Sequence, residues 1–304
     1  MDKIKLPNFI VVGAAKAGTT SIYEYLNAHP NIFIPDKKEC KYFSSMPTNY
    51  KGPQDDVVNK AVTKSFLEYC NLFNNVKEEK AIGDVSNDYL YFYENSINNI
   101  KKYLNEDVKI IISLRNPIER AYSHYLNLVR NNREPKATFE EAIADNDNRK
   151  KWHWVWYWSY LDVGLYNNQV QAYIDNFKYV KIILFEELTN NTEETVKDLF
   201  EFIGVDSSFK LNDYPVYNKS GYPKNKLLHN FLTKPNVIHE GIKKIAYLSG
   251  LYENIKKKKE KLFYDNLEKT KIKVETRQQL IEYFCNDVKN LEELIKKDLN
   301  HWLK

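Results

Sequence analysis

The sequence predicts an α/β fold in which a central parallel sheet is flanked by helices on both faces. Apolar, β-branched runs at residues 9–12, 109–114 and 180–185 have the composition of buried strands, and helical patterns separate them. None of the runs alternates cleanly between apolar and polar residues, as a half-exposed antiparallel strand would. Strands that alternate with helices along the chain are typical of a parallel sheet.

A single domain is predicted for the 304 residues, with a helical C-terminal part that begins at about residue 226. The nine glycines and ten prolines are scattered, and no repeat or linker marks a boundary. The lysine-rich C-terminal part offers no chemistry of its own. Three roles stay open for it: capping the fold, completing a ligand groove, or forming a homo-oligomer.

The first predicted strand, residues 9–12, leads through a loop into a helix predicted over residues 20–27. In this loop Gly13 and Gly18 have the separation found in the nucleotide P-loop, GxxxxGK[ST]. That motif has a lysine directly after its second glycine, where the lysine binds the nucleotide phosphates. Here Thr19 occupies the position. The loop therefore departs from a nucleotide P-loop.

The same loop nevertheless has the donors of an anion site. Backbone N–H groups of a glycine-flanked loop and the positive end of the following helix both attract an anion. Lys16, the only lysine of the loop, adds a full charge, and Thr19 and Thr20 add hydroxyl donors. We therefore predict a phosphate-bearing ligand that is bound by a lysine inside the loop. A tight turn without a ligand is the alternative.

The second predicted strand, residues 109–114, ends at a cation, Arg115, which precedes a helix predicted over residues 117–131. A magnesium-dependent phosphotransferase would instead need an aspartate at the end of a strand to hold the metal. A guanidinium binds phosphate directly and in a bidentate way, and Ser123 adds a hydroxyl from the following helix. These residues predict a second phosphate site at the carboxyl ends of the strands. A structural ion pair of Arg115 is the alternative.

The third predicted strand, residues 180–185, precedes an amphipathic helix predicted over residues 191–204. An apolar stripe runs along this helix, and Gly204 is a typical helix stop. This segment completes the alternation of strands and helices on which the α/β prediction depends.

Two of these motifs resemble those of sulfotransferases that use 3′-phosphoadenosine 5′-phosphosulfate (PAPS). The loop "GAAKAGTTSI" resembles their 5′-phosphosulfate loop, and "LRNPIERAYSHY" resembles their 3′-phosphate motif, especially in the branch of the heparan sulfate and other carbohydrate sulfotransferases. Four further segments resemble the same branch: "KKECKYFS", "YLDVGLYNNQVQAYIDNF", "ILFEEL" and "NKSGYPKNK". The resemblance covers about residues 8–230. It implies one sulfotransferase domain over 1–304 with a P-loop-like core of the nucleoside-kinase type and a helical C-terminal extension at about 226–304.

The resemblance implies that PAPS is the co-substrate, that adenosine 3′,5′-bisphosphate (PAP) is the by-product, and that no metal is required. Lys16 is then expected at the bridging oxygen, where the leaving phosphate gains charge. The implied cofactor contacts are Lys16, Ala17, Gly18, Thr19 and Thr20 for the 5′-phosphate, and Arg115 and Ser123 for the 3′-phosphate. In the late loop Lys219 and Gly221 match a nucleotide-covering segment, although the fuller basic-glycine-arginine run of the carbohydrate branch is missing.

The resemblance also implies a glutamate as the base that removes a proton from the acceptor. The matching residue is Glu39, for which a surface ion pair with neighbouring lysines is the alternative. Asp84 matches a segment that lines the acceptor cleft and is the reserve base; it would otherwise be a helix cap. We find no histidine in a segment that matches the histidine base of the cytosolic small-molecule branch, and we expect His124 to be a packing or hydrogen-bonding residue of its helix. The acceptor is therefore expected to be a saccharide or glycan.

The segment "KWHWVWYWSYL" has an unusual density of aromatic residues. As a strand it would present its four tryptophans on one face, whereas on the expected helix they would spread around the axis. Indole rings stack well on sugars, so the segment is a candidate acceptor surface. A buried helix with aromatic packing is the alternative.

Composition bounds the partners and the compartment. The net charge is only +4, so we expect no nucleic-acid partner. The N-terminal apolar run is too short for a signal core or a membrane span, and Cys40, Cys70 and Cys285 show no metal-ligand spacing. We therefore expect a cytoplasmic protein without a membrane span.

Two other functions stay open at this stage. A nucleotide kinase with an altered P-loop would prefer ATP and magnesium, and it would need a metal-binding carboxylate that we do not find. A non-catalytic relative that binds nucleotide or glycan would bind the cofactor without turnover.

Overall fold

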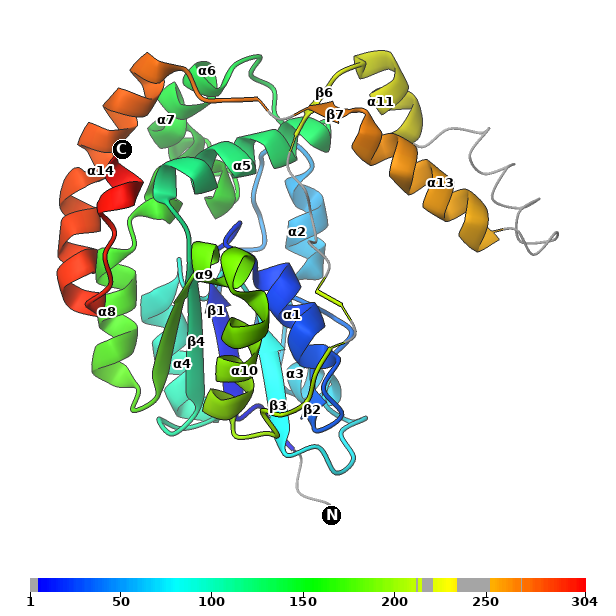
Figure 1. Cartoon of the computed structure of the whole chain (residues 1–304), viewed down its shortest axis with the longest axis vertical. Coiled ribbons are helices and arrows are strands. Elements are labelled where there is room, and N and C mark those ends of the chain that lie inside the picture. Colours follow the sequence, from blue (N-terminus) through cyan, green and yellow to red (C-terminus); the bar gives the residue numbers. More distant parts are fainter. Residues whose placement is uncertain (1–4, 212, 215–220, 234–251, 269) are drawn as a thin grey trace.

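The computed structural model describes residues 5–211, 213–214, 221–233, 252–268 and 270–304. A five-stranded sheet with the order β2-β3-β1-β4-β5 forms its centre (Figure 1). Every pairing in this sheet is parallel. The strands are β1 (Phe9–Gly13), β2 (Ile32–Phe33), β3 (Ala81–Val85), β4 (Lys109–Leu114) and β5 (Val180–Leu184). The predicted α/β class with a parallel sheet is therefore confirmed.

The sequence predicts β1, β4 and β5 but not β2 and β3. β2 has only two residues, and β3 has Gly83 and Asp84 in its interior, so neither forms an apolar run. Gly83 faces Phe9 on the neighbouring strand, and a Cβ at this position would lie 2.2 Å from the Phe9 ring. Glycine therefore lets the Phe9 ring pack directly on the β3 backbone.

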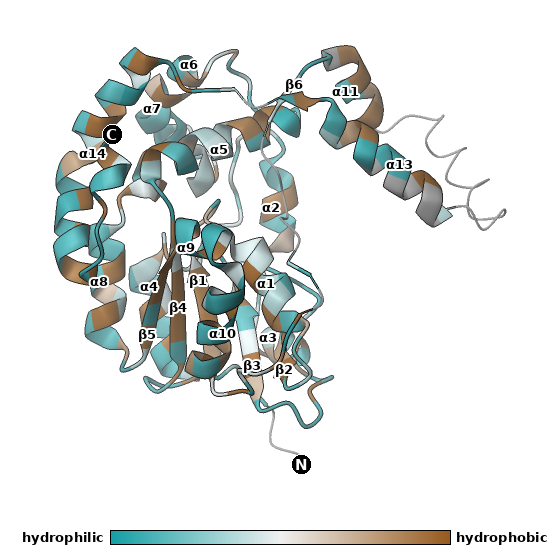
Figure 2. Cartoon of the chain, viewed as in Figure 1, coloured by the Kyte–Doolittle hydropathy of each residue, from teal (hydrophilic) through white to brown (hydrophobic). Residues whose placement is uncertain are grey.

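Helices cover both faces of the sheet (Figure 1). One face packs against α1 (Thr19–Asn27) and α10 (Thr192–Ile203). The helices that bury apolar side chains with the other face are α3 (Phe66–Asn71), α4 (Tyr93–Tyr103), α5 (Pro117–Arg130), α8 (Asn167–Asn176) and α14 (Val274–Ile295). Figure 2 shows apolar strands in the middle and polar outer surfaces on the helices. Removing this apolar surface from water contributes about 25 cal/mol per Å².

Short helices and turns complete the main body. The α-helices are α2 (Asp55–Ala61), α6 (Phe139–Ala144), α7 (Asn146–Lys151) and α9 (Phe185–Asn190). The 3₁₀ turns are Trp156–Trp158, Asp162–Gly164 and Asn300–Leu303. Within the described ranges, no helix combines the length and the apolar character needed to cross a bilayer.

The aromatic segment forms neither the strand nor the long helix considered from its sequence. α7 ends at Lys151, and the tryptophans continue into the 3₁₀ turn Trp156–Trp158. Trp158 is fully buried, and its Nε1 donates a hydrogen bond to Oδ1 of Asp55, 2.9 Å away. The same carboxylate accepts from the backbone N–H of Val155 at 2.8 Å. Asp55 of α2 therefore anchors this segment through two hydrogen bonds.

The C-terminal part is helical, as predicted. α11 (Lys226–Thr233) and α13 (Tyr252–Asp265) extend away from the sheet in Figure 1, and a short antiparallel pair of strands, β6 (Tyr222–Pro223) and β7 (Leu267–Glu268), lies at their base. α14 packs against α5 and α8. Beyond α14, the backbone carbonyl of Trp302 accepts a hydrogen bond of 3.1 Å from Nδ2 of Asn116. Three roles were left open for the C-terminal part. Of these, α14 and the segment after it take the first and cap the fold.

Candidate active site

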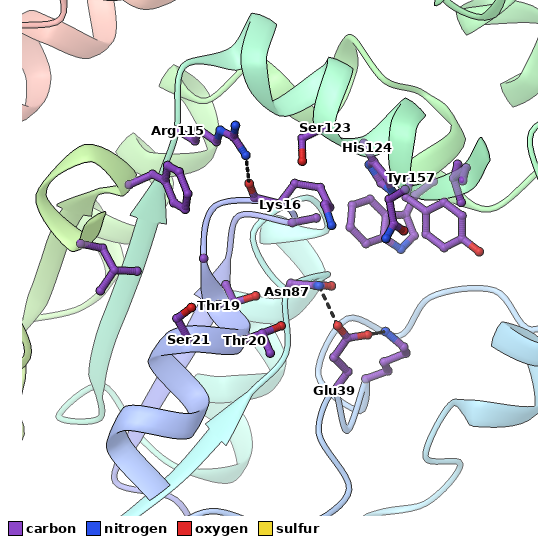
Figure 3. Close-up of a pocket in the computed structure, with 18 of the residues that line it drawn as sticks. Lys16, Thr19, Thr20, Ser21, Glu39, Asn87, Arg115, Ser123, His124 and Tyr157 are labelled. Carbon is purple, nitrogen blue, oxygen red and sulfur yellow. Dashed lines mark hydrogen bonds and ion pairs between the residues drawn. The ribbon is translucent and has the colours of Figure 1, made fainter. Parts of the chain in front are cut away.

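A cavity of 460 Å³ opens where β1 and β4 end and α1 and α5 begin (Figure 3). We call it the pocket. Most residues predicted for the site from the sequence line it. These are Lys16, Gly18, Thr19, Thr20, Glu39, Arg115 and Ser123. Positions separated by about a hundred residues in the chain therefore meet in one cavity at the carboxyl ends of the parallel strands, where ligands of such sheets bind.

The loop between β1 and α1 is held tightly against the rest of the sheet. The hydroxyl of Ser113, on β4, donates to the carbonyl of Ala17 at 2.6 Å, and the N–H of Ala14 donates to the carbonyl of Ser113 at 2.7 Å. Ala17 is fully buried and does not line the pocket. Gly18 has a φ of +87°, and a Cβ there would lie 2.7 Å from a Leu188 methyl group. Glycine is therefore required at this turn.

The start of α1 supplies the polar rim of the pocket. The helix begins at Thr19, directly after the turn, so its first N–H groups have no partner within the helix. Thr19, Thr20 and Ser21 all line the pocket, and Nζ of Lys38 donates to the Thr20 hydroxyl at 2.5 Å. Free N–H groups, hydroxyls and a helix N-terminus together form an environment that stabilises an anion.

Lys16 lies in the loop with its ammonium group in the pocket (Figure 3). Its backbone adopts a left-handed φ of +70°, and its carbonyl accepts a 3.3 Å hydrogen bond from Nη1 of Arg115. Burial, together with the positive charges of Arg130, Arg115 and Lys38, lowers the pKa of Lys16 to about 7. The pocket therefore has a surplus of positive charge that a bound anion would neutralise.

Arg115 is positioned by the turn from β4 into α5. The Asn116 side chain accepts from the N–H of Ile118 at 2.9 Å, and Pro117 is the first helical residue. The Arg115 guanidinium lies over the Phe185 ring, 4.5 Å from its centre, in a cation–π contact. Figure 3 shows Ser123 on the same side of the pocket, one to two helical turns further along α5.

Glu39 lies across the pocket in a loop with unusual backbone geometry (Figure 3). Its carboxylate accepts from Nδ2 of Asn87 at 2.7 Å and pairs with Nζ of Lys41, also at 2.7 Å. Glu39 and Lys41 both have left-handed backbone, with φ of +60° and +56°. Non-glycine residues in this region cost about 1–3 kcal/mol each and cluster at functional sites.

The charges around Glu39 keep its carboxylate ionised. Burial would raise its pKa, but the ammonium groups of Lys41, Lys38 and Lys16 outweigh burial and lower the pKa of Glu39 below its ordinary value. Lys41 also lies 3.9 Å from the fully buried Asp88. The pKa of Lys41 is raised, because the carboxylates of Glu39 and Asp88 outweigh the effect of burial.

Among the other predicted residues, Asp84 and Gly221 are described and do not line the pocket. Asp84 is fully buried on β3, where its carboxylate accepts hydrogen bonds from Tyr69, Tyr89 and Ser86 at 2.7–3.0 Å. Burial raises its pKa to about 6 despite these bonds. Gly221 lies at β6, where a Cβ would approach Leu267 to 2.8 Å. Lys219 lies outside the described residues.

Several lining residues are not predicted from the sequence. They lie around Glu39, on α2, on α5 and directly after α5: Lys41, Val57, Val58, Asn87, Asn127, Leu128 and Arg133. Trp156 and Tyr157, which belong to the aromatic segment named as a candidate acceptor surface, line the pocket as well. His124, expected to be a packing or hydrogen-bonding residue, has its Nδ1 3.4 Å from Nη1 of Arg120 and also lines the pocket. Burial and the nearby Arg120 lower its pKa well below the ordinary value, so its ring is neutral at pH 7.

The fold and the pocket define a P-loop-like α/β domain, and comparison with known proteins identifies its family. The chain matches the sulfotransferase domain family over residues 6–230. A crystal structure of a sulfotransferase from Alicyclobacillus acidocaldarius is similar over 99% of this chain and 100% of that chain, with a TM-score of 0.77 and 32% sequence identity. The chain therefore belongs to the sulfotransferase family, a family of PAPS-dependent enzymes.

Curated relatives point to the same family. The membrane-associated sulfotransferase kil1 of Dictyostelium discoideum is 37% identical over 122 residues, which are 40% of this chain and 22% of that protein. Human carbohydrate sulfotransferase 15 is 23% identical over 246 residues, covering 66% of this chain and 44% of that protein. The chain thus spans less than half the length of these relatives. It has distant homology to the carbohydrate and heparan sulfate sulfotransferases, as its motifs predict.

Proposed function

We propose that this protein transfers the sulfuryl group of PAPS to a hydroxyl group, or less readily an amine, of a carbohydrate acceptor. The observation that carries the proposal is the pocket itself, which joins a cation-rich anion loop to an ionised carboxylate, Glu39. A base and a site for the leaving phosphate are the two elements that a direct, in-line transfer needs.

The residues of the pocket fit the two phosphate groups of PAPS. Lys16, Gly18, Thr19 and Thr20 would hold the 5′-phosphate, and Arg115 and Ser123 would hold the 3′-phosphate. The supporting observation is that burial, together with the positive charges of Arg130, Arg115 and Lys38, lowers the pKa of Lys16 in the absence of an anion. A guanidinium and an ammonium bind phosphate without a metal. We assign no cofactor contact to Ala17 beyond its backbone, and none to Gly221.

In the proposed reaction Glu39 accepts the proton of the acceptor hydroxyl as its oxygen attacks sulfur. The bond between sulfur and the bridging oxygen breaks, and its electron pair stays on the 5′-phosphate of PAP. Lys16 would stabilise the charge that develops there, since a preorganised cation in a water-poor site acts most strongly on developing charge. We prefer Glu39 to Asp84 as the base, because Asp84 has its oxygens occupied by three hydroxyl groups away from the pocket.

Lys41 would keep its place while Glu39 changes charge. Its ammonium group lies 2.7 Å from Glu39 and 3.9 Å from Asp88. When Glu39 takes up the proton and loses its charge, Asp88 still offers Lys41 a carboxylate. The buried ammonium group therefore never lacks a counter-charge, which would be costly in this environment.

We also propose that residues 1–304 form one domain and that the protein acts in the cytoplasm. The packing of α14 on α5 and α8 supports the first proposal. The second is supported by Cys40, Cys70 and Cys285, all of which are unpaired thiols, as expected in a reducing compartment.

Calorimetry on the purified chain tests the cofactor class. PAP should bind without added metal, and more tightly than ADP in the presence of magnesium, because Arg115 and Ser123 are placed to bind a 3′-phosphate, which ADP lacks. An Arg115→Ala variant should lose most of this preference. Tighter binding of ADP with magnesium would support the kinase alternative instead, and binding of PAP without any turnover of PAPS would support a non-catalytic relative.

The affinity for PAP should fall as the pH rises above 7. Lys16 has a pKa of about 7 in the unliganded pocket, and a bound phosphate would raise it toward the ordinary value. Since the complex then holds a proton that the free protein has lost, affinity is greatest below pH 7 and falls by up to about tenfold per pH unit above it. Calorimetry at pH 8 in two buffers of different ionisation enthalpy should detect proton uptake. Uptake that persists undiminished in Lys16→Ala would contradict this assignment.

A further inference from the structure

The pocket has two sides of different chemistry, one on either side of Lys16. Figure 3 shows Lys16 between Arg115 and Tyr157. Besides the proposed phosphate contacts, the pocket is lined by Glu39 and Lys41 and by residues of α2, of the segment after α5 and of the aromatic turn. We call the following set the acceptor half: Glu39, Lys41, Val57, Val58 and Ala61 of α2, Arg133, Trp156 and Tyr157. The proposed phosphate contacts use none of them.

The acceptor half has carboxylates close to each of its cations. Nη2 of Arg133 pairs with Oδ1 of the fully buried Asp55 at 3.1 Å. Lys41 pairs with Glu39 and lies near Asp88. Lys41 and Arg133 thus each have a carboxylate partner already, and Lys16 and Lys38 act on Glu39 from the side of the phosphate loop. An acidic substituent on the acceptor would have to compete with these carboxylates for a cation and would be repelled by Glu39.

The rest of the acceptor half is apolar and aromatic. Val57, Val58 and Ala61 present aliphatic surface from α2, and 60% of Val57 is exposed. The Trp156 ring is stacked on Tyr91 with a centroid distance of 5.2 Å, which fixes its plane. Flat aromatic and aliphatic surfaces bind the apolar faces of sugar rings and of aromatic substituents.

Asp55 joins the aliphatic and aromatic parts into one rigid unit. It is the first residue of α2, and its carboxylate binds the backbone of Val155, the Trp158 ring and Arg133 at 2.8–3.1 Å. The Arg133 guanidinium in turn lies 5.3 Å from the centre of the Tyr157 ring. The apolar slot between α2 and the aromatic turn is therefore formed before any acceptor binds, which favours selectivity for shape and charge.

We infer that the acceptor is an uncharged glycoside with a flat or apolar substituent next to the sugar, and that the pocket discriminates against acidic acceptors. The inference rests on the proposed function and adds the chemical class of its substrate. It separates this chain from the acceptor class that a resemblance to heparan sulfate sulfotransferases alone would imply, because those acceptors are polyanions.

A matched pair of acceptors tests the charge preference. 4-Carbamoylphenyl and 4-carboxyphenyl β-glycosides of glucose, galactose and N-acetylglucosamine have the same size and the same sugar hydroxyls, and differ in one negative charge. With PAPS as donor, the carbamoyl compound of the preferred sugar should have a kcat/KM at least about tenfold higher, as expected when one charge lacks a partner in the complex.

A single variant should largely remove the preference. Val57→Lys adds a cation to the aliphatic surface at an exposed helical position, and should raise kcat/KM for the carboxyphenyl glycoside about tenfold with little effect on the carbamoyl compound. Asp56→Asn is the matched control, because it changes the net charge by the same single unit on the same helix but outside the pocket lining. It should leave both rates unchanged.

Calorimetry with PAP on the wild-type protein and on each variant distinguishes a failure of the proposed function from a failure of the acceptor inference. If PAP does not bind to the wild-type protein, the proposed function fails and this inference fails with it. If PAP binds but the carboxyphenyl glycosides are used as well as the carbamoyl ones, or none of the neutral glycosides is sulfated, the acceptor inference alone is overturned. A Val57→Lys variant with unchanged preference would remove α2 from the acceptor half.

Discussion

Replacing Lys16 by alanine should reduce turnover about 10²–10³-fold, the range found when one preorganised donor to a developing charge is removed. Lys16 is the loop residue whose ammonium group lies in the pocket between Arg115 and Tyr157. Its pKa of about 7 would rise when a phosphate binds, so we expect its ammonium group to be charged while charge develops on the leaving phosphate. We expect kcat to fall much more than the KM for PAPS rises, to be measured by steady-state kinetics with saturating acceptor.

The fold should tolerate this change. The backbone at residue 16 keeps the same left-handed conformation with alanine, and Arg115 binds the Lys16 carbonyl rather than its side chain. Lys37→Ala is the matched control, because Lys37 is a partly exposed lysine that pairs with Glu68 and does not line the pocket. Unchanged kcat in Lys16→Ala would remove the leaving-group role from Lys16.

Replacing Glu39 by glutamine should abolish measurable transfer while the affinity for PAP stays within about twofold, since general-base catalysis contributes about 10²–10⁴-fold. Glutamine has nearly the same shape and still accepts hydrogen bonds from Asn87 or Lys41, but it cannot take up the acceptor proton. The measurement combines single-turnover kinetics with calorimetry. Glu68→Gln, which removes an exposed carboxylate outside the pocket, serves as the control.

The pH profile of the wild-type enzyme gives a second check on Glu39. A base acts when it is deprotonated, and the neighbouring ammonium groups lower the pKa of Glu39 below its ordinary value. Activity that depends on Glu39 should therefore persist as the pH falls, and decline only below the ordinary carboxyl range. Full activity of Glu39→Gln would require another base, and the variant Asp84→Asn would then test the reserve candidate.

Much of the fold follows from local sequence. The runs that form β1, β4 and β5 are buried on both faces, so their composition alone marks them as strands. β2 and β3 are not predicted because neither has the composition of a buried strand. β2 is an edge strand of two residues, and β3 contains Gly83 and Asp84. In β3, the partners that make these residues acceptable, Phe9 and the hydroxyls around Asp84, come from other elements.

The candidate cofactor residues could also be found from sequence. Lys16, Thr19 and Thr20 are close together in one loop, and Arg115 and Ser123 belong to one strand-to-helix segment. Short spacings of this kind are constrained by the loop or helix that contains them, so a sequence motif records the local geometry. The sequence thus determined the parallel α/β fold, the family and the anion-binding segments.

Only the tertiary structure decided how these segments form a site with an acceptor side. The pairing of Lys41 with Glu39 and Asp88, the burial of Asp84, and the link from Asp55 to the aromatic turn all join residues from separate elements. Val57 and Arg133 belong to ordinary helical and loop sequence, and they line the pocket only because distant segments pack together. Contacts of this kind depend on distances in space, which a linear pattern does not encode, and for that reason the character of the acceptor half emerged only from the folded chain.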